Sequence, residues 1–131
     1  MDAALAIGRI VLVILFIFSG LGKFADLSGT AAYIASKGLP YPQLLAVAAG
    51  AGELICGLAI AIGWQTRLAA IGLIVFTVAA AFFFHDFWNV PAGAERANEM
   101  IHAMKNLSII GGLIVLAVAG AGRLSVDGRR D

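Results

Sequence analysis

The sequence predicts an all-α integral membrane protein that folds as a single four-helix bundle. Hydrophobic residues make up 61% of the 131 positions and charged residues only 13%, half of the roughly 25% that soluble domains carry. The apolar residues gather in four long stretches, each close to the roughly 20 residues that a helix needs to cross a bilayer. A soluble chain of this length could not bury so much apolar surface, so we expect lipid to solvate it.

The four predicted spans cover residues 3–23, 44–63, 68–85 and 104–121. The first is a retained helix, because its apolar part exceeds the roughly 7–15 residues of a signal-peptide core. The link at residues 64–67 is so short that the second and third spans must be antiparallel neighbours. The amphipathic segment Glu95–Asn106 is expected to run without a break into the fourth span.

A short helix, Ser28–Lys37, is predicted between spans one and two. Asp26 or Ser28 can cap its start, and Gly38 followed by Pro40 ends it. Its apolar residues are modest in number. We therefore expect it to lie at the membrane surface or to tuck partly into the bundle.

Four spans place both termini on the same side of the membrane, together with Arg67. That side carries a slight excess of basic residues. The positive-inside rule then favours cytoplasmic termini.

Several function classes find no support in the composition or the motifs. The net charge is +1, with no basic run that would indicate nucleic-acid binding. A Ser-His-Asp arrangement, a phosphate-binding loop, a paired CxxC and a dinucleotide fingerprint are all lacking in the sequence. Cys56 is a lone cysteine inside an apolar stretch, and such a residue is usually an inert small hydrophobe. Nothing indicates a soluble type of enzyme.

Glu53 and Arg9 are the two charges deepest in apolar sequence. An ionised carboxylate in hydrocarbon is costly, so Glu53 must face the protein interior, find a partner or be protonated. Arg9 is one candidate partner, unless it extends to the headgroups instead. A pair of this kind would be a structural contact that sets helix register, or else a group that handles protons or binds a quinone or a small anion.

The opposite end of the bundle collects further polar candidates. Lys23 ends the first span and is expected to extend toward the interface. Glu99 and His102 form a Glu-x-x-His pair, but di-iron bundles use two such pairs and additional carboxylates. A three-ligand metal site with His85 is therefore a minor alternative to a solvated helix face. Lys105 and Asn106 lie where the fourth helix enters the membrane, and could hold an anion, a carboxylate or a quinone carbonyl.

Short motifs follow one another in a specific order along the chain. They are Arg9, Phe16, Gly20 and Lys23-Phe24 in the first span, Glu53, Gly57, Gly63 and Thr66-Arg67 around the second, His85 after the third, and Lys105-Asn106-Leu107 with Gly111-Gly112 in the fourth. Their order and spacing resemble the DoxX family of small four-helix membrane proteins. The resemblance covers nearly the whole chain, residues 1–131, as one domain.

The resemblance implies a multi-pass protein of the bacterial plasma (inner) membrane. The family takes its name from a subunit associated with a terminal quinol oxidase, and relatives act in thiosulfate:quinone oxidoreduction or accompany enzymes of oxidative and thiol stress. The resemblance leaves the cofactor unassigned, with a quinone as one candidate. The candidate partners beside the lipid are a soluble or membrane redox enzyme and further copies of the chain. The matching site candidates are Arg9, Lys23, Glu53, His85, Lys105 and Asn106.

Three functions remain open on the sequence. The leading hypothesis is an accessory membrane subunit of a quinone- or redox-linked assembly, with no catalytic residue assigned. The first alternative is a thiosulfate or thiol:quinone oxidoreductase with its quinone near Glu53 or Lys105. The second is a small transporter or channel formed by a homo-oligomer through glycine-rich helix faces.

Overall fold

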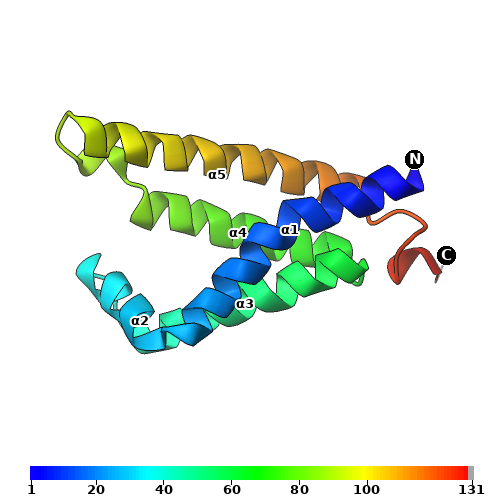
Figure 1. Ribbon diagram of the computed structural model, residues 1–131, viewed down its shortest axis with the longest axis horizontal. Helices are drawn as coiled ribbons and strands as arrows, with labels where there is room; N and C mark the ends of the chain where they lie inside the picture. The colour runs from blue at the N-terminus through cyan, green and yellow to red at the C-terminus, as the bar shows by residue number, and fades with distance from the viewer. Residues whose placement is uncertain (130–131) are drawn as a thin grey trace.

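The computed structural model describes residues 1–129 and confirms the all-α four-helix bundle. The long helices are α1 (Asp2–Ala25), α3 (Pro42–Ile62), α4 (Thr66–Phe84) and α5 (Ala94–Ala119). All four are long and apolar enough to cross a membrane. They lie lengthwise beside one another, with the short helix α2 (Leu27–Ser36) between α1 and α3 in sequence (Figure 1).

The short helix α2 starts and stops where its capping chemistry predicts. Of the two candidate caps, Asp26 is the one used, and its carboxylate accepts a hydrogen bond from the backbone N–H of Gly29 at 2.9 Å. Ala31 and Ile34 are buried against Ala46 of α3. The helix therefore packs one face on α3, while most of its other residues are exposed.

The last long helix, α5, is continuous over 26 residues. It includes the amphipathic segment that precedes the apolar run, so the prediction of one unbroken helix is confirmed. A single turn of 3-10 helix, η1 (Phe87–Asn89), connects α4 to it.

Glycines bring α1 and α3 into close contact. A Cβ atom added to Gly20 would lie 2.9 Å from the carbonyl oxygen of Gly50, and one added to Gly57 would lie 3.0 Å from Cγ1 of Ile17. Real Cβ atoms essentially never come as close to another atom as the 2.9 Å at Gly20. Only glycine fits at Gly20 at this helix separation, and the contact sets the register of α1 on α3.

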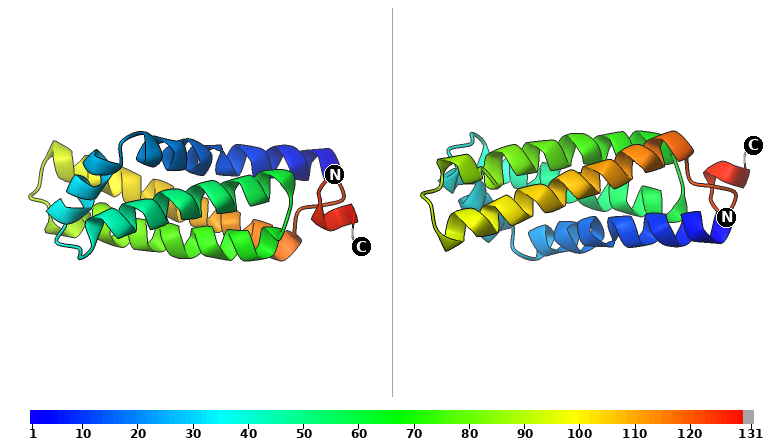
Figure 2. Two further views of the ribbon diagram at one scale, coloured as in Figure 1. Left: turned by 90° about the horizontal axis from the view of Figure 1, so that it is seen from below. Right: turned by 90° about the horizontal axis from the view of Figure 1, so that it is seen from above.

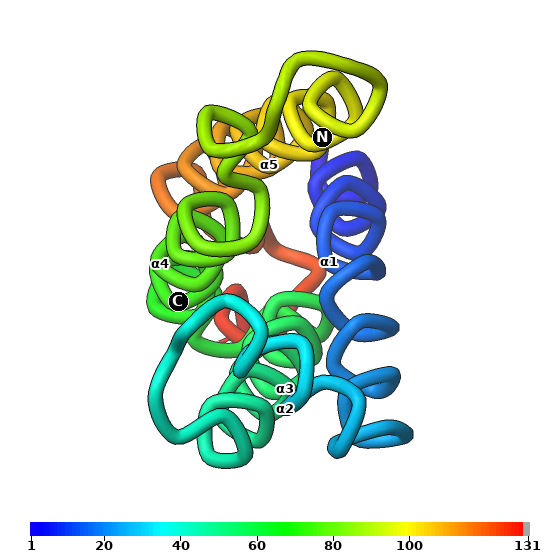
Figure 3. The backbone as a smooth tube through the Cα atoms, turned by 90° about the vertical axis from the view of Figure 1, so that its left-hand side faces the viewer, coloured from blue at the N-terminus to red at the C-terminus, as the bar shows by residue number. Residues whose placement is uncertain are grey.

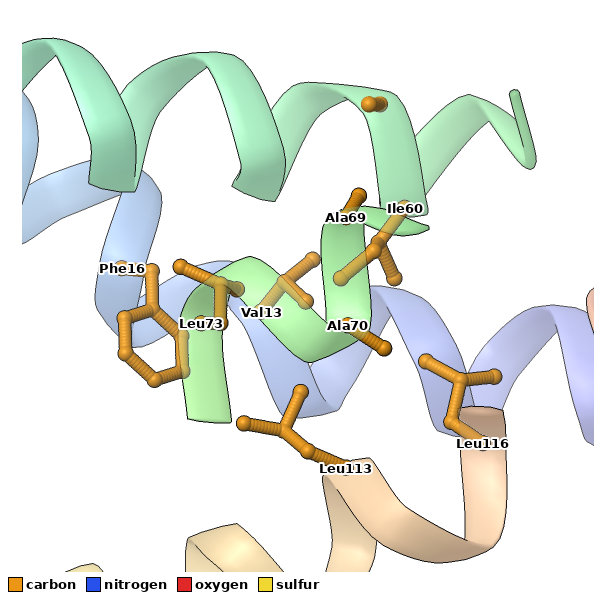
Figure 4. Packing of buried hydrophobic residues seen from close by; sticks show 9 residues of the cluster. Val13, Phe16, Ile60, Ala69, Ala70, Leu73, Leu113 and Leu116 are labelled. Carbon is orange, nitrogen blue, oxygen red and sulfur yellow. The ribbon is translucent and has the colours of Figure 1, made fainter. Parts of the chain in front are cut away.

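The main apolar core lies in the half of the bundle nearer the termini. Its buried side chains come from all four long helices and include Val13, Phe16, Ile60, Ala70, Leu73, Leu113 and Leu116 (Figure 4). A smaller cluster joins α2 to the start of α3. The two clusters leave the interior between them less tightly filled.

Both termini lie at the same end of the molecule, as predicted (Figure 2). The C-terminal segment folds back on the bundle there: the N–H groups of Val126 and Asp127 donate to the carbonyl oxygens of Ile62 and Gly63. The Asp127 carboxylate accepts hydrogen bonds from the N–H groups of Gln65 and Thr66, both at 2.9 Å, and so caps the start of α4.

The helices α1 and α5 diverge toward the end opposite the termini. They touch where Leu12 packs on Gly112: a Cβ added to Gly112 would lie 3.1 Å from Cδ1 of Leu12. Beyond that point α1 crosses toward α2 and α3, whereas α5 keeps beside α4 (Figures 1 and 3). This divergence positions the candidate site.

Candidate functional site

A cavity of about 750 Å³ opens inside the bundle where α1 and α5 diverge. This volume falls within the roughly 300–1,000 Å³ of small-molecule sites. Its wall is mostly apolar and includes residues of all five α-helices. The candidate residues on the wall are Lys23, Glu53, His85, Lys105 and Asn106.

A buried ion pair forms one polar region of the wall. The Lys23 ammonium lies 2.7 Å from Oε2 of Glu53, and the Glu53 side chain is only 4% exposed. Ser19 completes the group, because its hydroxyl accepts from Lys23 at 2.8 Å and donates to Oε2 at 3.2 Å. The ammonium also lies 5.9 Å from the centroid of the Phe76 ring, within cation–π range.

The second oxygen of Glu53 has spare hydrogen-bonding capacity. Within residues 1–129, both hydrogen-bond partners of the carboxylate bind Oε2. Among residues 1–129, the one fully buried side-chain N or O atom without a hydrogen-bond partner is the hydroxyl of Thr66. Oε1 of Glu53 also has no partner but does not meet this criterion, so it is not fully buried. Because Glu53 lines the cavity, Oε1 can accept a hydrogen bond from a molecule inside it.

A second polar region lies on α5 and at the end of α4. His85 Nδ1 is 2.7 Å from Oε2 of Glu99, and its ring stacks on His102 with centroids 5.0 Å apart. The ammonium of Lys105 lies 3.3 Å from Nδ1 of His102. Lys105 and Asn106 thus reach the cavity from α5, while Lys23 and Glu53 reach it from α1 and α3.

The sequence profile of the DoxX family matches residues 4–86, more than half of the chain. The chain belongs to the DoxX family. It is 38% identical to the inner membrane protein YphA of Escherichia coli over 125 residues, which cover 95% of this chain and 89% of that one. It is 36% identical to the inner membrane protein YqjF of the same organism over 129 residues, which cover 96% of this chain and 91% of that one.

A third relative comes from Mycobacterium tuberculosis. The membrane protein Rv3486 is 32% identical over 127 residues, which cover 92% of this DoxX chain and 77% of the relative. No solved structure gives a significant match. The resemblance inferred from the short motifs is confirmed, and the chain is an integral membrane protein of this family.

Arg9 of this DoxX protein does not pair with Glu53 and does not line the cavity. Its guanidinium donates to the carbonyl oxygens of Ala61 at 3.3 Å, and of Ala121 and Leu124 at 2.6 Å each. Only 5% of the residue is exposed, so it does not extend to the headgroups either. The physical reason is register: α3 runs antiparallel to α1, which places the last turn of α3 beside Arg9.

Lys23 also departs from the prediction that it extends toward the interface. Its side chain turns back into the bundle toward Glu53. The glycine at position 50 allows this, since a Cβ there would come within 3.3 Å of Cβ of Lys23. The close approach of α1 and α3 lets the lysine stem run along the helix surface to the carboxylate.

The weak metal candidates Glu99 and His102 lie next to His85 but do not converge with it on one point. The two imidazole rings are stacked with an interplanar angle of 21°, and their Nδ1 atoms face different partners, Glu99 for His85 and Lys105 for His102. Within residues 1–129, no three His, Cys, Asp or Glu side chains are arranged to hold a metal ion. The polar groups at this end of the DoxX bundle form hydrogen bonds to one another instead.

Cys56 and Ser19 differ in their relation to the cavity. The sulfur of Cys56 lies 3.2 Å from the position of an added Cβ on Gly72 and packs against the apolar core. Cys56 is not on the cavity wall. Ser19, which is not among the residues that the sequence predicts for the site, does line the cavity. The signal was present, because Ser19 precedes Lys23 by four residues and so shares its helix face.

Proposed function

We propose that this DoxX protein is an inner-membrane subunit that binds a quinone headgroup in the cavity and serves a redox-linked assembly. One observation carries the proposal: polar groups from α1, α3 and α5 meet around an otherwise apolar cavity. The names of the two Escherichia coli relatives support the inner membrane as the location.

The cavity wall suits the chemistry of a quinone. A quinone ring is apolar in the middle and carries an oxygen at each of two opposite positions. On α5, the Lys105 ammonium and the Asn106 amide can donate hydrogen bonds to one oxygen. On the other side, the Lys23–Glu53 pair offers a donor and, at Oε1 of Glu53, an acceptor. A bound quinone would supply reversible two-electron chemistry within the membrane.

An accessory role is favoured over a thiol oxidoreductase. In that alternative the oxidised sulfur belongs to the thiosulfate or thiol substrate, and the lone cysteine of the chain, Cys56, packs against the core outside the cavity wall and so is not placed to relay electrons to the quinone. A homo-oligomeric channel also gains no support from the glycines of the α1–α3 contact. Gly20, Gly50 and Gly57 are used within the chain.

The quinone content of the purified protein tests the proposal. The protein is extracted with its surrounding lipid in copolymer nanodiscs, and quinone per protein is measured by mass spectrometry. We expect near-stoichiometric quinone in the wild type and at least about tenfold weaker retention in Lys105→Ala, because a hydrogen bond to a charged group contributes about 1.5–3 kcal/mol. Glu53→Gln should also lower the quinone content.

Arg96→Ala is the matched control. Arg96 lies on the same helix, α5, but not on the cavity wall. Its removal should leave the quinone content unchanged. A wild-type quinone content no higher than that of an unrelated helical membrane protein from the same cells would refute the proposal.

A further inference from the structure

We infer that the cavity opens sideways into the lipid between α1 and α5, and that its ligand is a long-tailed amphiphile whose tail leaves through this opening. We call the opening the seam, and define it by Leu15 to Lys23 on α1 and by Lys105 to Ile109 on α5. The inference rests on the proposed function and adds a ligand class, namely a molecule drawn from the bilayer with its tail attached.

The geometry of α1 and α5 carries the first step. Both helices line the cavity, α1 through Leu15, Ser19 and Lys23, and α5 through Lys105, Asn106 and Ile109. They make few contacts with each other, whereas α1 packs extensively on α3 and α5 on α4. The two edges of the seam separate progressively toward the end opposite the termini (Figures 1 and 3).

The opposite side of the cavity is covered by α2. The ring of Tyr33 lies 5.2 Å from that of Phe84 and ties α2 to α4. Ile34 of α2 packs on Ala46 of α3, which ties α2 to α3 as well. Leu39 and Phe84 pack against this cluster. No comparable cluster of buried residues bridges the diverging parts of α1 and α5 within residues 1–129.

Polarity changes along the seam as an amphiphile requires. The polar wall residues of the seam, Lys23, Lys105 and Asn106, lie toward the end opposite the termini. The apolar ones, Leu15 and Ile109, lie nearer the middle of the bundle. Leu15 is eight residues before Lys23, which corresponds to about 12 Å along the helix. It lines the cavity and is 48% exposed, so one side chain borders both the cavity and the accessible surface at this depth. Tyr33, on the α2 side, lines the cavity and is exposed as well, so the direction of the opening rests on the gap between α1 and α5. A headgroup held at the polar end would have its tail directed toward the bilayer interior.

The cavity volume also exceeds what a headgroup needs. A six-membered aromatic ring fits a cavity of about 150 Å³, and this cavity measures about 750 Å³. Most of the remaining wall is apolar. A headgroup alone would leave that wall unfilled, and the first part of an aliphatic tail would fill it.

Titration calorimetry in lipid nanodiscs tests the seam. The probes are 2,3-dimethoxy-5-methyl-1,4-benzoquinone without a tail and the same ring with a decyl tail. We expect Leu15→Trp to weaken binding of the tailed probe at least tenfold and to change binding of the tailless probe less than twofold. Comparing each variant with the wild type for the same probe removes the effect of lipid partitioning.

Three further variants make the test specific. Ile109→Trp narrows the seam from the α5 side and should repeat the effect of Leu15→Trp. Ile14→Trp, on the outer face of α1, should change neither affinity. Leu45 also lines the cavity and is 37% exposed, but it lies on α3 near α2. Leu45→Trp takes up cavity volume without narrowing the seam, so it should weaken binding of both probes by similar factors.

The outcomes separate this inference from the proposed function. Equal losses for both probes in Leu15→Trp and Ile109→Trp, or no loss in either variant, would overturn the seam while quinone binding stands. A selective loss in Leu45→Trp would place the opening beside α2 and also overturn it. If neither probe binds the wild type, the quinone proposal fails and the inference fails with it.

Discussion

Lys23 and Glu53 form an ion pair in the protein interior. Removing one partner of a buried ion pair leaves an uncompensated charge, and this destabilises a fold by about 3–5 kcal/mol. The Glu53 side chain is only 4% exposed, so little water can solvate a carboxylate left alone there.

We therefore predict that Lys23→Met destabilises the protein by about 3–5 kcal/mol. Adding Glu53→Gln to this variant should recover most of the loss, because the amide carries no charge. Thermal unfolding in a mild detergent, followed by circular dichroism, compares the two variants with the wild type. A double variant as unstable as Lys23→Met alone would show that the pair is not what stabilises this region.

Arg9 shows what the sequence could not reveal at this scale. Its depth in the first span made it a candidate, but its partners are the carbonyl oxygens of Ala61, Ala121 and Leu124. Backbone acceptors leave no trace in a residue pattern. Two of the three also belong to the segment after α5, whose return onto the bundle has no periodicity that would predict it.

At the level of helices, the α1–α3 contact depends on the absence of a side chain at Gly20. A methyl group there would meet the backbone of α3, at 2.9 Å from the Gly50 oxygen. Gly22 is two residues away on the same helix, and nothing lies within 4 Å of an added Cβ. The two positions form a matched pair.

Gly20→Ala should destabilise the protein by about 1–3 kcal/mol, the usual cost of overpacking. Gly22→Ala should be neutral or stabilising by up to about 1 kcal/mol, since alanine has the higher helix propensity. Thermal unfolding in the same detergent measures both. Equal effects at the two positions would contradict the packing seen between α1 and α3.

Apolar runs were sufficient to predict the helices, but not their ends. The second predicted span begins at residue 44, whereas α3 begins at Pro42, which occupies the first turn. The third begins at residue 68, whereas α4 begins at Thr66, where Asp127 supplies the cap. Hydropathy detects what lipid contacts, while helix ends depend on hydrogen bonds from segments remote in sequence.

For the whole molecule, polar residues in apolar stretches were a good guide to the cavity. Such side chains avoid lipid and so converge inside the bundle, as Glu53, His85 and Asn106 do. The pairing among them was not predictable, because it depends on helix register. Arg9 points to the interior too, but at the end that the C-terminal segment covers.

The distribution of free basic residues predicts the orientation in the membrane. Lys23 lines the cavity and pairs with Glu53, and Arg9 is buried. Lys105 is exposed but lies within helix α5 and not in a loop. The end with the termini then carries the exposed residues Arg67, Arg123 and Arg129. The other end carries Arg96 and Lys37, and Lys37 is paired with Asp86 at 3.3 Å. Basic loops stay on the cytoplasmic side.

We therefore predict cytoplasmic termini. In a bacterial host, a green fluorescent protein fused after residue 131 should fluoresce, and alkaline phosphatase at the same point should be inactive. Alkaline phosphatase inserted between α4 and α5, next to Pro91, should be active. The reverse pattern would place the polar end of the cavity, with Lys23 and Lys105, on the cytoplasmic side. A redox partner would then have to approach this end from the cytoplasm and not from the periplasm.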